Sequence, residues 1–173
     1  MIYILEGPDR CGKTTLGKAI ATKLKGNYIH ASGHKSLMPG MTAFHSGILD
    51  IAEWAQKQGI STVIDRLWVS EMVYGELLRP KDPGHVNYKV DQFRIRCSKL
   101  GVTYIFCMTK DAVSRHAMDR DHEHAYTDSQ FKQIVEGYTY IRDIMSTGLE
   151  KVISYDFEED GYDINKWLEA HGI

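Results

Sequence analysis

Residues 1–15 read Met1-Ile-Tyr-Ile-Leu-Glu-Gly-Pro-Asp-Arg-Cys-Gly-Lys-Thr-Thr15, and this stretch decides the fold. Its first part, Ile2–Leu5, is apolar and rich in β-forming side chains, which predicts a buried strand. Its second part, Gly7–Thr14, fits the pattern G-x-x-x-x-G-K-[ST] between a strand and a helix. Glycines let successive backbone N–H groups converge on phosphate oxygens, and the start of the helix adds positive potential. The stretch therefore predicts a phosphate-binding loop.

Two side chains of this loop carry the chemistry that the motif requires. Lys13 can reach the β- and γ-phosphates of a nucleoside triphosphate as a point charge. Thr14 offers a hydroxyl that can ligate Mg²⁺. The residues predicted to bind the nucleotide, taken as ATP, are Gly7, Asp9, Arg10, Cys11, Gly12, Lys13, Thr14 and Thr15.

Short β-rich runs alternate with longer helix-like stretches along the rest of the chain. We predict strands over Ile2–Leu5, Asn27–His30, Thr62–Ile64, Val102–Met108 and Val152–Tyr155. We predict helices over Lys13–Lys25, Thr42–Gln58, Val69–Leu78, Tyr88–Leu100, Ala112–Met118, Asp128–Met145 and Ile164–His171. Alternating βα units predict a parallel sheet covered on both faces. The expected fold is a three-layer α/β P-loop NTPase fold with a five-stranded parallel sheet.

Helix ends and loops give further expectations. Asp128 is expected to cap the helix that it begins, because its carboxylate can accept from the first free amides. Gly26, Gly59 and Gly101 each follow a helical run, where a left-handed residue is expected. We expect residues 1–173 to form a single domain, with a small lid at about 112–127.

Composition narrows the class of protein. The 173 residues include 43% hydrophobic and 25% charged side chains, an ordinary globular mixture. The net charge of −2 argues against a nucleic-acid partner. No apolar run approaches the ~20 residues of a membrane helix, and the chain opens directly on a strand, so neither a membrane segment nor a secretory signal is expected. Three cysteines without metal spacing suit a reducing, cytoplasmic location.

In a second block, Val63-Ile-Asp-Arg66, an acidic residue and a basic residue stand at the end of a predicted strand. Open α/β sheets bind ligands at the carboxyl ends of their strands. Asp65 could orient Mg²⁺ or accept a proton, and Arg66 could pair with an anionic phosphate.

These blocks resemble the thymidylate kinase family. Leu5-Glu-Gly-Pro-Asp-Arg-Cys-Gly-Lys-Thr-Thr15 looks like that family's phosphate-binding loop, and Asp65-Arg66 with Ser70 and Val73-Tyr74 looks like its Asp-Arg motif. The short chain looks most like the virus- and phage-type deoxynucleotide kinases. The resemblance spans most of the chain, although its specific motifs lie in these two blocks.

The resemblance implies a role for each matching position. The implied catalytic residues are Lys13, Arg10, Asp65 and Arg66, with Arg115 and Arg120 in the lid. Thr14 and Asp65 would hold Mg²⁺, Asp65 in part through water. The implied acceptor site comprises Asp9, Phe44, His45, Arg66, Ser70 and Tyr74. A homodimer is implied as well.

The departures from the family concern the base. The family places an aromatic residue and an Arg on the helix before the Asp-Arg strand to stack on and read thymine. Residues 42–58 contain no Arg here, and Phe44-His45 stands nearest to that pair. Leu67 replaces the usual aromatic after Arg66. A dTMP-like acceptor is favoured, but dGMP or another deoxynucleoside monophosphate stays open.

Two other functions remain alternatives. A deoxynucleoside kinase would phosphorylate a neutral 5′-hydroxyl and would need Asp65 as general base. A monophosphate acceptor is already anionic and needs cationic clamps instead, which the four arginines supply. A non-catalytic nucleotide-binding module is the third candidate, although lid arginines would have little use in it.

Overall fold

The computed structural model describes residues 1–31, 40–81, 85, 88–113, 127–160 and 163–173. Its strands are β1 (Ile2–Glu6), β2 (Asn27–His30), β3 (Thr62–Asp65), β4 (Thr103–Cys107) and β5 (Lys151–Tyr155). They form one sheet in the order β2-β3-β1-β4-β5, and every neighbouring pair is parallel. The predicted five-stranded parallel sheet is thereby confirmed.

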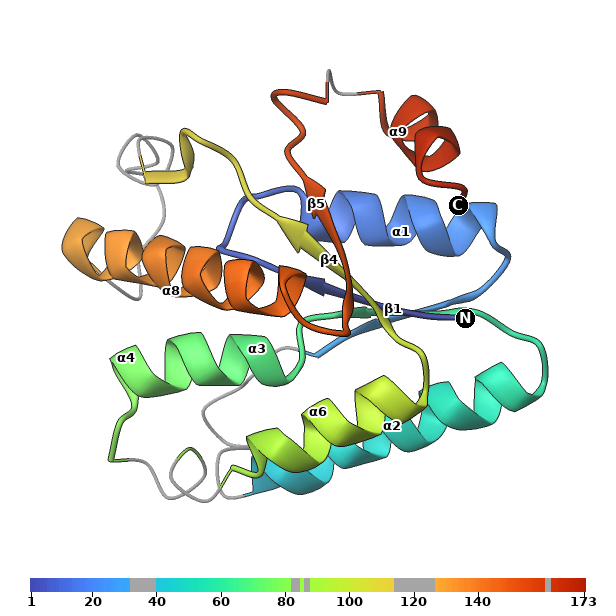
Figure 1. Ribbon diagram of the computed structural model, residues 1–173, viewed down its shortest axis with the longest axis horizontal. Helices are drawn as coiled ribbons and strands as arrows, with labels where there is room; N and C mark the ends of the chain where they lie inside the picture. Colours follow the sequence, from blue (N-terminus) through green and yellow to red (C-terminus); the bar gives the residue numbers. More distant parts are fainter. Residues whose placement is uncertain (32–39, 82–84, 86–87, 114–126, 161–162) are drawn as a thin grey trace.

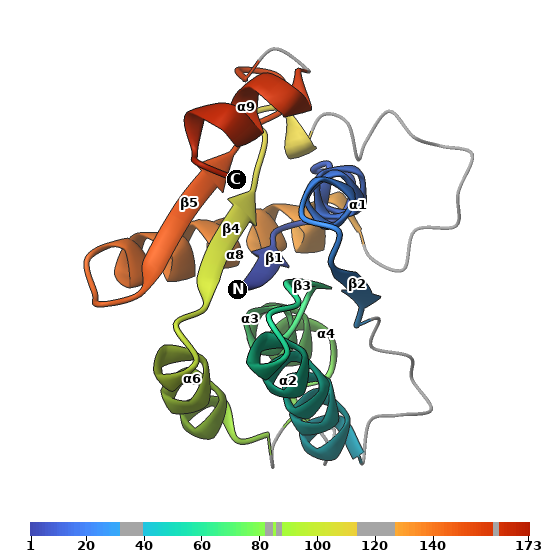
Figure 2. The ribbon, with the colours of Figure 1, turned by 90° about the vertical axis from the view of Figure 1, so that its right-hand side faces the viewer.

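Helices cover both faces of this sheet (Figures 1 and 2). One face carries α1 (Lys13–Lys23) and α9 (Ile164–Ala170), which contact each other. The other face carries α2 (Met41–Lys57) and α6 (Val90–Lys99), together with a third helix built from α3 (Trp68–Ser70), η2 (Glu71–Gly75) and α4 (Glu76–Leu78). The long helix α8 (Asp128–Ser146) packs against β5, η2 and α4.

The third helix contains one π-helical turn, η2, where the sequence predicted an uninterrupted helix over 69–78. Gly75 ends that turn. A Cβ at Gly75 would lie 2.1 Å from Nδ1 of His85 and 2.8 Å from Oε1 of Glu71. Glycine is therefore needed so that His85 can approach the helix. Single π turns inside α-helices are frequent at functional sites.

The core lies on the two sides of the central strands. Every residue of β1, β3 and β4 is buried, which is why these strands read as continuous apolar runs. The largest buried side chain, Trp68, satisfies its indole N–H through the Tyr104 hydroxyl at 3.0 Å. Each such aromatic contributes roughly 1.5–3 kcal/mol by removing apolar surface from water.

Two local predictions about helix ends are wrong. Thr127, and not Asp128, caps α8: its hydroxyl accepts from the Gln130 N–H, and the Gln130 side chain accepts from the Thr127 N–H. This reciprocal pair satisfies two helix-end amides where Asp128 could satisfy only one. Lys25, and not Gly26, takes the left-handed conformation after α1. Gly26 is required for another reason, because a Cβ there would lie 2.4 Å from the Ser61 carbonyl oxygen.

Of the remaining local predictions, some are confirmed and others concern residues outside the described part of the chain. Gly59 and Gly101 have the expected positive φ. Most of the predicted helix over Ala112–Met118 lies outside the described residues, as do Arg115, Arg120 and most of the expected lid. None of the helices that the structure describes has the length and apolar character needed to span a membrane.

Candidate active site

The carboxyl ends of β1, β2 and β3 meet at one edge of the sheet and open into a cavity of about 880 Å³. The phosphate-binding loop forms one wall, and the third helix forms the opposite wall. The cavity is lined by Asp9, Arg10, Gly12, Lys13, Thr14, Thr15, His30, Ala31, Met41, His45, Asp65, Arg66, Leu67, Ser70, Glu71, Tyr74, Leu78, Arg79 and Gln130. Its volume is large enough for nucleotide-sized ligands.

Backbone geometry shapes the loop for anions. Gly12 has φ 77° and stands immediately before α1, whose first amides receive no side-chain cap. Those N–H groups and the helix dipole favour a negative group at this end. Gly7 has φ 141°, and a Cβ there would lie 2.0 Å from the carbonyl oxygen of Cys107. Both positions therefore require glycine.

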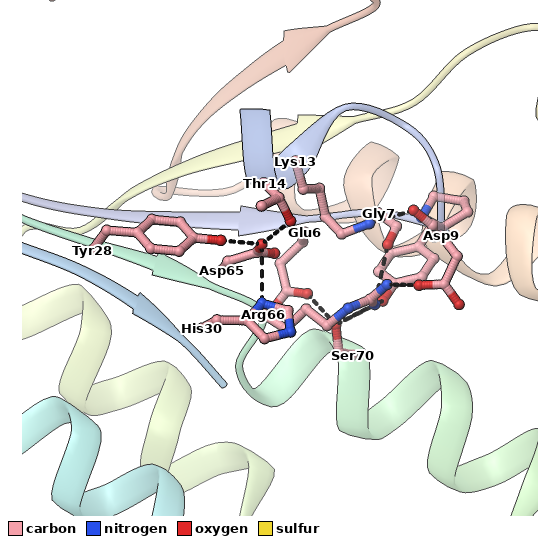
Figure 3. Close-up of polar contacts among 12 residues, drawn as sticks. Glu6, Gly7, Asp9, Lys13, Thr14, Tyr28, His30, Asp65, Arg66 and Ser70 are labelled. Carbon is pink, nitrogen blue, oxygen red and sulfur yellow. Dashed lines mark hydrogen bonds and ion pairs between the residues drawn. The ribbon is translucent and has the colours of Figure 1, made fainter. Parts of the chain in front are cut away.

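Lys13 is buried beneath the loop and donates to the carbonyl oxygen of Pro8 (Figure 3). Burial, together with the positive charge of Arg66, lowers the pKa of Lys13 to about 8. An anion bound at the loop would favour the ammonium form. The site thus contains a cation that is stabilised most when a phosphate is present.

Asp65 is fully buried and is held by three neighbours on a single oxygen. Oδ2 accepts from the Thr14 hydroxyl at 2.8 Å and from the Tyr28 hydroxyl at 2.7 Å, and it lies 3.1 Å from Nδ1 of His30 (Figure 3). Burial raises the pKa of Asp65, but the hydrogen bonds from Tyr28 and Thr14, together with nearby positive charge such as that of Lys13, outweigh it, so the net shift is downward. Asp65 is therefore an ionised carboxylate. Its second oxygen, Oδ1, is buried without a hydrogen-bond partner in the described structure.

Arg66 reaches across the base of the cavity to the loop. Its guanidinium pairs with the carboxylate of Asp9 and donates to the Gly7 carbonyl at 3.2 Å. It also donates to the Tyr138 hydroxyl at 3.1 Å and lies 5.0 Å from the centre of the Tyr74 ring. The backbone of Arg66 has φ 75°, a conformation that a side chain disfavours. Residues held in this way cluster at binding sites.

A buried hydrogen-bond chain supports Arg66 from below. Glu6 accepts from the Ser70 hydroxyl at 2.6 Å and from the Leu67 N–H at 2.8 Å. The hydroxyls of Ser70 and Tyr138 are 2.7 Å apart. When Glu6 is ionised, Ser70 donates to it, so Tyr138 donates to Ser70 and the Tyr138 oxygen accepts from Arg66. The chain fixes both the turn after β3 and the guanidinium that emerges from it.

The carboxyl group of Glu6 makes the stability of the folded protein depend on pH. Burial raises the pKa of Glu6 to about 7, against the opposing effects of the Ser70 hydrogen bond and the Arg66 charge. The folded chain therefore holds this proton up to about pH 7, whereas the unfolded chain loses it near 4.5. Stability from the protonated form is complete at low pH and is lost as pH rises through 7.

We expect Glu6→Gln to remove this pH dependence. Between pH 5 and 8 the wild-type free energy of unfolding should fall, relative to that of the variant, by on the order of 2 kcal/mol. Urea unfolding at both pH values measures the difference. Glu169→Gln on the exposed face of α9 is the matched control and should show no such trend. A constant difference between wild type and Glu6→Gln would contradict the assignment.

The far wall of the cavity contains a second ion pair. The Glu71 carboxylate accepts from Arg79 at 2.9 Å, and its other oxygen lies 3.4 Å from Nδ1 of His85. Glu71 is only 3% exposed. Since both Glu71 and Arg79 line the cavity, a ligand entering it meets a charged pair on the side opposite the phosphate-binding loop.

Most of the residues predicted from the sequence lie around this one cavity. Asp9, Arg10, Lys13, Thr14, Thr15, Asp65, Arg66, Ser70, Tyr74 and His45 line it, together with Gly12. Gly7 and Cys11 do not line it; burial raises the pKa of the Cys11 thiol. Phe44 also lies outside the lining and packs against the hydrophobic core.

Several residues around the cavity carried no role in the sequence analysis: Glu6, Tyr28, His30, Glu71, Arg79 and Tyr138. Glu6 directly follows the first predicted strand and His30 ends the second, so their position at the sheet edge was a usable signal. The glycine at position 17 was a weaker signal for Tyr28. A Cβ at Gly17 would lie 2.8 Å from the Tyr28 ring, which must pack on α1 to reach Asp65. Tyr138 is 72 residues away from Arg66 in sequence, and no local pattern links the two.

Comparisons with known proteins agree with this geometry. A family model described as "ATPase family associated with various cellular activities (AAA)" matches residues 3–66, which run from β1 through the phosphate-binding loop to Arg66. The YorR protein of Bacillus subtilis, solved in complex with phosphorylated GDP, has a TM-score of 0.68 at 22% identity. The match covers 99% of this chain and 98% of that one. The chain has a P-loop NTPase fold.

Two further solved structures share this fold. Thymidylate kinase from Candida albicans has a TM-score of 0.59 at 14% identity, with 99% of this chain and 92% of that chain covered. Deoxyadenosine kinase from M. mycoides, with dCMP and a flexible dCDP bound, has a TM-score of 0.54 at 15% identity, with 98% and 95% covered. No curated protein sequence is similar enough to match.

Proposed function

We propose that this chain transfers the γ-phosphoryl group of ATP to a deoxynucleoside 5′-monophosphate, with a dTMP-like acceptor favoured. The observation that carries the proposal is the placement of Arg66. Its guanidinium lies in the same cavity as the phosphate-binding loop and pairs with Asp9 of that loop. A guanidinium in this position suits the phosphate of an acceptor, because two polyanions must be held together for phosphoryl transfer.

The roles of the remaining residues follow from their positions. Lys13 and the amides at the start of α1 would bind the β- and γ-phosphates, and Arg10 would help to neutralise the transferred group. Arg66 would hold the acceptor phosphate, with Asp9 at the sugar. Ser70 and Tyr74 would line the acceptor pocket. Arg115 and Arg120 stay predictions for the lid, as does the virus- and phage-type branch.

The residues around Asp65 fit a magnesium ion. Oδ1 of Asp65 is buried, ionised and without a hydrogen-bond partner in the described structure, which is costly unless a cation or its water binds there. The Thr14 hydroxyl is 2.8 Å from the other oxygen of the same carboxylate. Thr14 and Asp65 would therefore hold Mg²⁺, which neutralises charge on the phosphates when bound.

The same observation bears on the deoxynucleoside kinase alternative. A general base works best with a pKa near the working pH. The hydrogen bonds to Asp65 outweigh the effect of burial and lower its pKa, so Asp65 is a poor base and a good metal-binding group. The ligands of the similar structures support a nucleotide ligand in this fold: phosphorylated GDP for YorR, and dCMP with dCDP for the M. mycoides enzyme.

The deciding experiment measures ADP release from ATP and Mg²⁺ with matched acceptors. Each deoxynucleoside is compared with its own 5′-monophosphate. We expect turnover with monophosphates only. Turnover with nucleosides would instead support the deoxynucleoside kinase, with Asp65 as base. The absence of any acceptor-dependent ADP would leave a nucleotide-binding module and refute the kinase proposal.

A further inference from the structure

The hydroxyl group of Ser70 lies between the cavity and the buried carboxyl group of Glu6. Ser70 lines the cavity, whereas Glu6 is fully buried and does not line it. Oγ of Ser70 lies 2.6 Å from Oε2 of Glu6 and 3.2 Å from Nη1 of Arg66 (Figure 3). The hydroxyl oxygen of Tyr138 is 2.7 Å from the same Oγ. Ser70 has one hydroxyl proton, so its use by Glu6 decides whether a ligand can receive it.

The ionised form of Glu6 uses this proton inside the protein. A carboxylate only accepts hydrogen bonds, so the Ser70 hydroxyl donates to Oε2. The Ser70 oxygen then accepts from Tyr138 and from Arg66, and the Tyr138 oxygen accepts from Arg66. Both hydroxyl protons are engaged in this arrangement, and Ser70 has none to donate to a ligand.

The protonated form of Glu6 reverses the arrangement. Oε1 accepts from the Leu67 N–H at 2.8 Å, so the carboxyl proton belongs on Oε2, where it donates to Ser70. The Ser70 proton then turns away from Glu6, either toward the cavity or to the Tyr138 oxygen, which displaces the Tyr138 proton in turn. One hydroxyl proton beside the Arg66 guanidinium therefore needs a new acceptor, because a buried donor without one is unfavourable. An anionic oxygen bound by Arg66 supplies that acceptor.

Charge couples Glu6 to the same ligand. Burial raises the pKa of Glu6 to about 7, although the Ser70 hydrogen bond and the positive charge of Arg66 act in the opposite direction. A phosphate bound at Arg66 brings negative charge near the carboxyl group, and a like charge raises a carboxyl pKa further. The phosphate thus favours the protonated form of Glu6, and by linkage the protonated form favours the phosphate.

The other titratable groups around Glu6 are one cation, several neutral groups and paired carboxylates. The cation is Lys13, whose charge also acts on Glu6 and whose pKa burial lowers to about 8, so it too can gain a proton when an anion binds. The groups kept neutral by a raised pKa are Tyr88, Cys97, Tyr104, Cys107 and Tyr138. The carboxylates on adjoining elements are held by other side chains: Asp9 by Arg66, Asp65 by Thr14 and Tyr28, and Glu71 by Arg79.

We propose that Glu6 is a positioning residue of the acceptor site, which takes up a proton when an acceptor phosphate binds at Arg66 and so frees a hydroxyl of the Ser70–Tyr138 pair to donate to that phosphate. The proton comes from solvent and returns to it when the product leaves, and no bond of the nucleotide changes in this step. Glu6 touches no substrate and acts through Ser70 and Tyr138. The inference rests on the proposed function, and it states how the acceptor site responds to pH.

Calorimetric titration with dTMP at pH 7, in Pipes and in Tris buffer, measures the proton uptake on binding. We expect the wild type to take up about half a proton more than Glu6→Gln, because a group with a pKa of about 7 is half protonated in the free protein. The titrations of dTMP and of Lys13 occur in both proteins and largely cancel in the difference. Between pH 6 and 8, the Kd of the wild type for dTMP should rise about tenfold relative to that of Glu6→Gln.

Glu6→Gln is informative because its amide imitates the protonated carboxyl group. The amide oxygen can accept from the Leu67 N–H while the amide NH2 donates to Ser70. At pH 8 we therefore expect Glu6→Gln to bind dTMP more tightly than the wild type and to have a lower KM for it, with a far smaller change in kcat. A purely structural role of Glu6 would instead weaken binding at both pH values. Glu169→Gln, on the exposed face of α9, is the matched control and should keep the wild-type pH dependence.

Infrared spectroscopy of the wild type tests the same step without a substitution. The difference spectrum with and without dTMP at pH 8 should gain the C=O band of a protonated carboxyl group. Carbon-13 labelling of the glutamates should shift that band. Its absence would overturn the inference even if Glu6→Gln failed to fold, and circular dichroism at pH 6 and 8 checks the fold of the variant.

The outcomes separate this inference from the proposed function. If monophosphates are phosphorylated but the wild type and Glu6→Gln take up equal numbers of protons, the inference is overturned while the kinase proposal stands. If no monophosphate is phosphorylated, the kinase proposal fails. The calorimetry then decides the inference alone, and either equal proton uptake or the absence of dTMP binding overturns it.

Discussion

Lys13→Ala is expected to lower the rate of acceptor-dependent ADP formation by at least about a hundredfold while the fold stays intact. The side chain is buried under the loop, where water is excluded and a single positive charge acts strongly on phosphate oxygens. Its loss removes charge that matters most in the transition state, so kcat should fall more than the affinity for ATP.

The control is Lys18→Ala, which removes an exposed lysine from the same helix. Its activity should match that of the wild type. Circular dichroism and the melting temperature of Lys13→Ala check the fold. Near-normal turnover of a folded Lys13→Ala variant would show that Lys13 has no catalytic role, in spite of the sequence pattern of the loop.

Arg66→Ala is expected to act on the acceptor rather than on ATP. Charge-assisted hydrogen bonds are worth about 1.5–3 kcal/mol each, so kcat/KM for the monophosphate should fall by about two orders of magnitude. The KM for ATP should change far less. Steady-state kinetics with each substrate varied in turn measures the split.

Arg96→Ala is the matched control for Arg66→Ala. Arg96 is bonded to Asp50 and Glu53 on the outer surface of α2, away from the cavity. Its loss should leave the kinetics for both substrates unchanged. If the acceptor kinetics of Arg66→Ala equalled those of the wild type, Arg66 would have no place in the acceptor site.

The sheet and the loop could be predicted because their signals are local. A run such as Ile2–Leu5 shows its burial in consecutive residues, and the Gly7–Thr14 pattern shows its turn in fixed spacings. Asp65 and Arg66 could be placed at the cavity because parallel strands bring their carboxyl ends to one edge.

Partnerships across the fold could not be predicted in the same way. Glu6 and Ser70 are 64 residues apart, and their contact follows from how the third helix packs under β1. Phe44 and His45 show a different failure, which concerns the phase of a helix. Adjacent helical residues point about 100° apart, and the phase of α2 turns His45 toward the cavity and Phe44 toward the hydrophobic core. The prediction placed Phe44-His45 on the correct helical turn of α2, but of these two residues only His45 lines the cavity.

Gly7 has a mechanical consequence. The contact with Cys107 leaves no space between the first turn of the phosphate-binding loop and the end of β4, so the loop is clamped between two strands of a rigid sheet. We therefore expect the backbone of this turn to keep its position when a substrate binds. We expect any change of shape among the described walls of the cavity to come from the opposite side, which contains the π turn η2 and its last residue, Gly75.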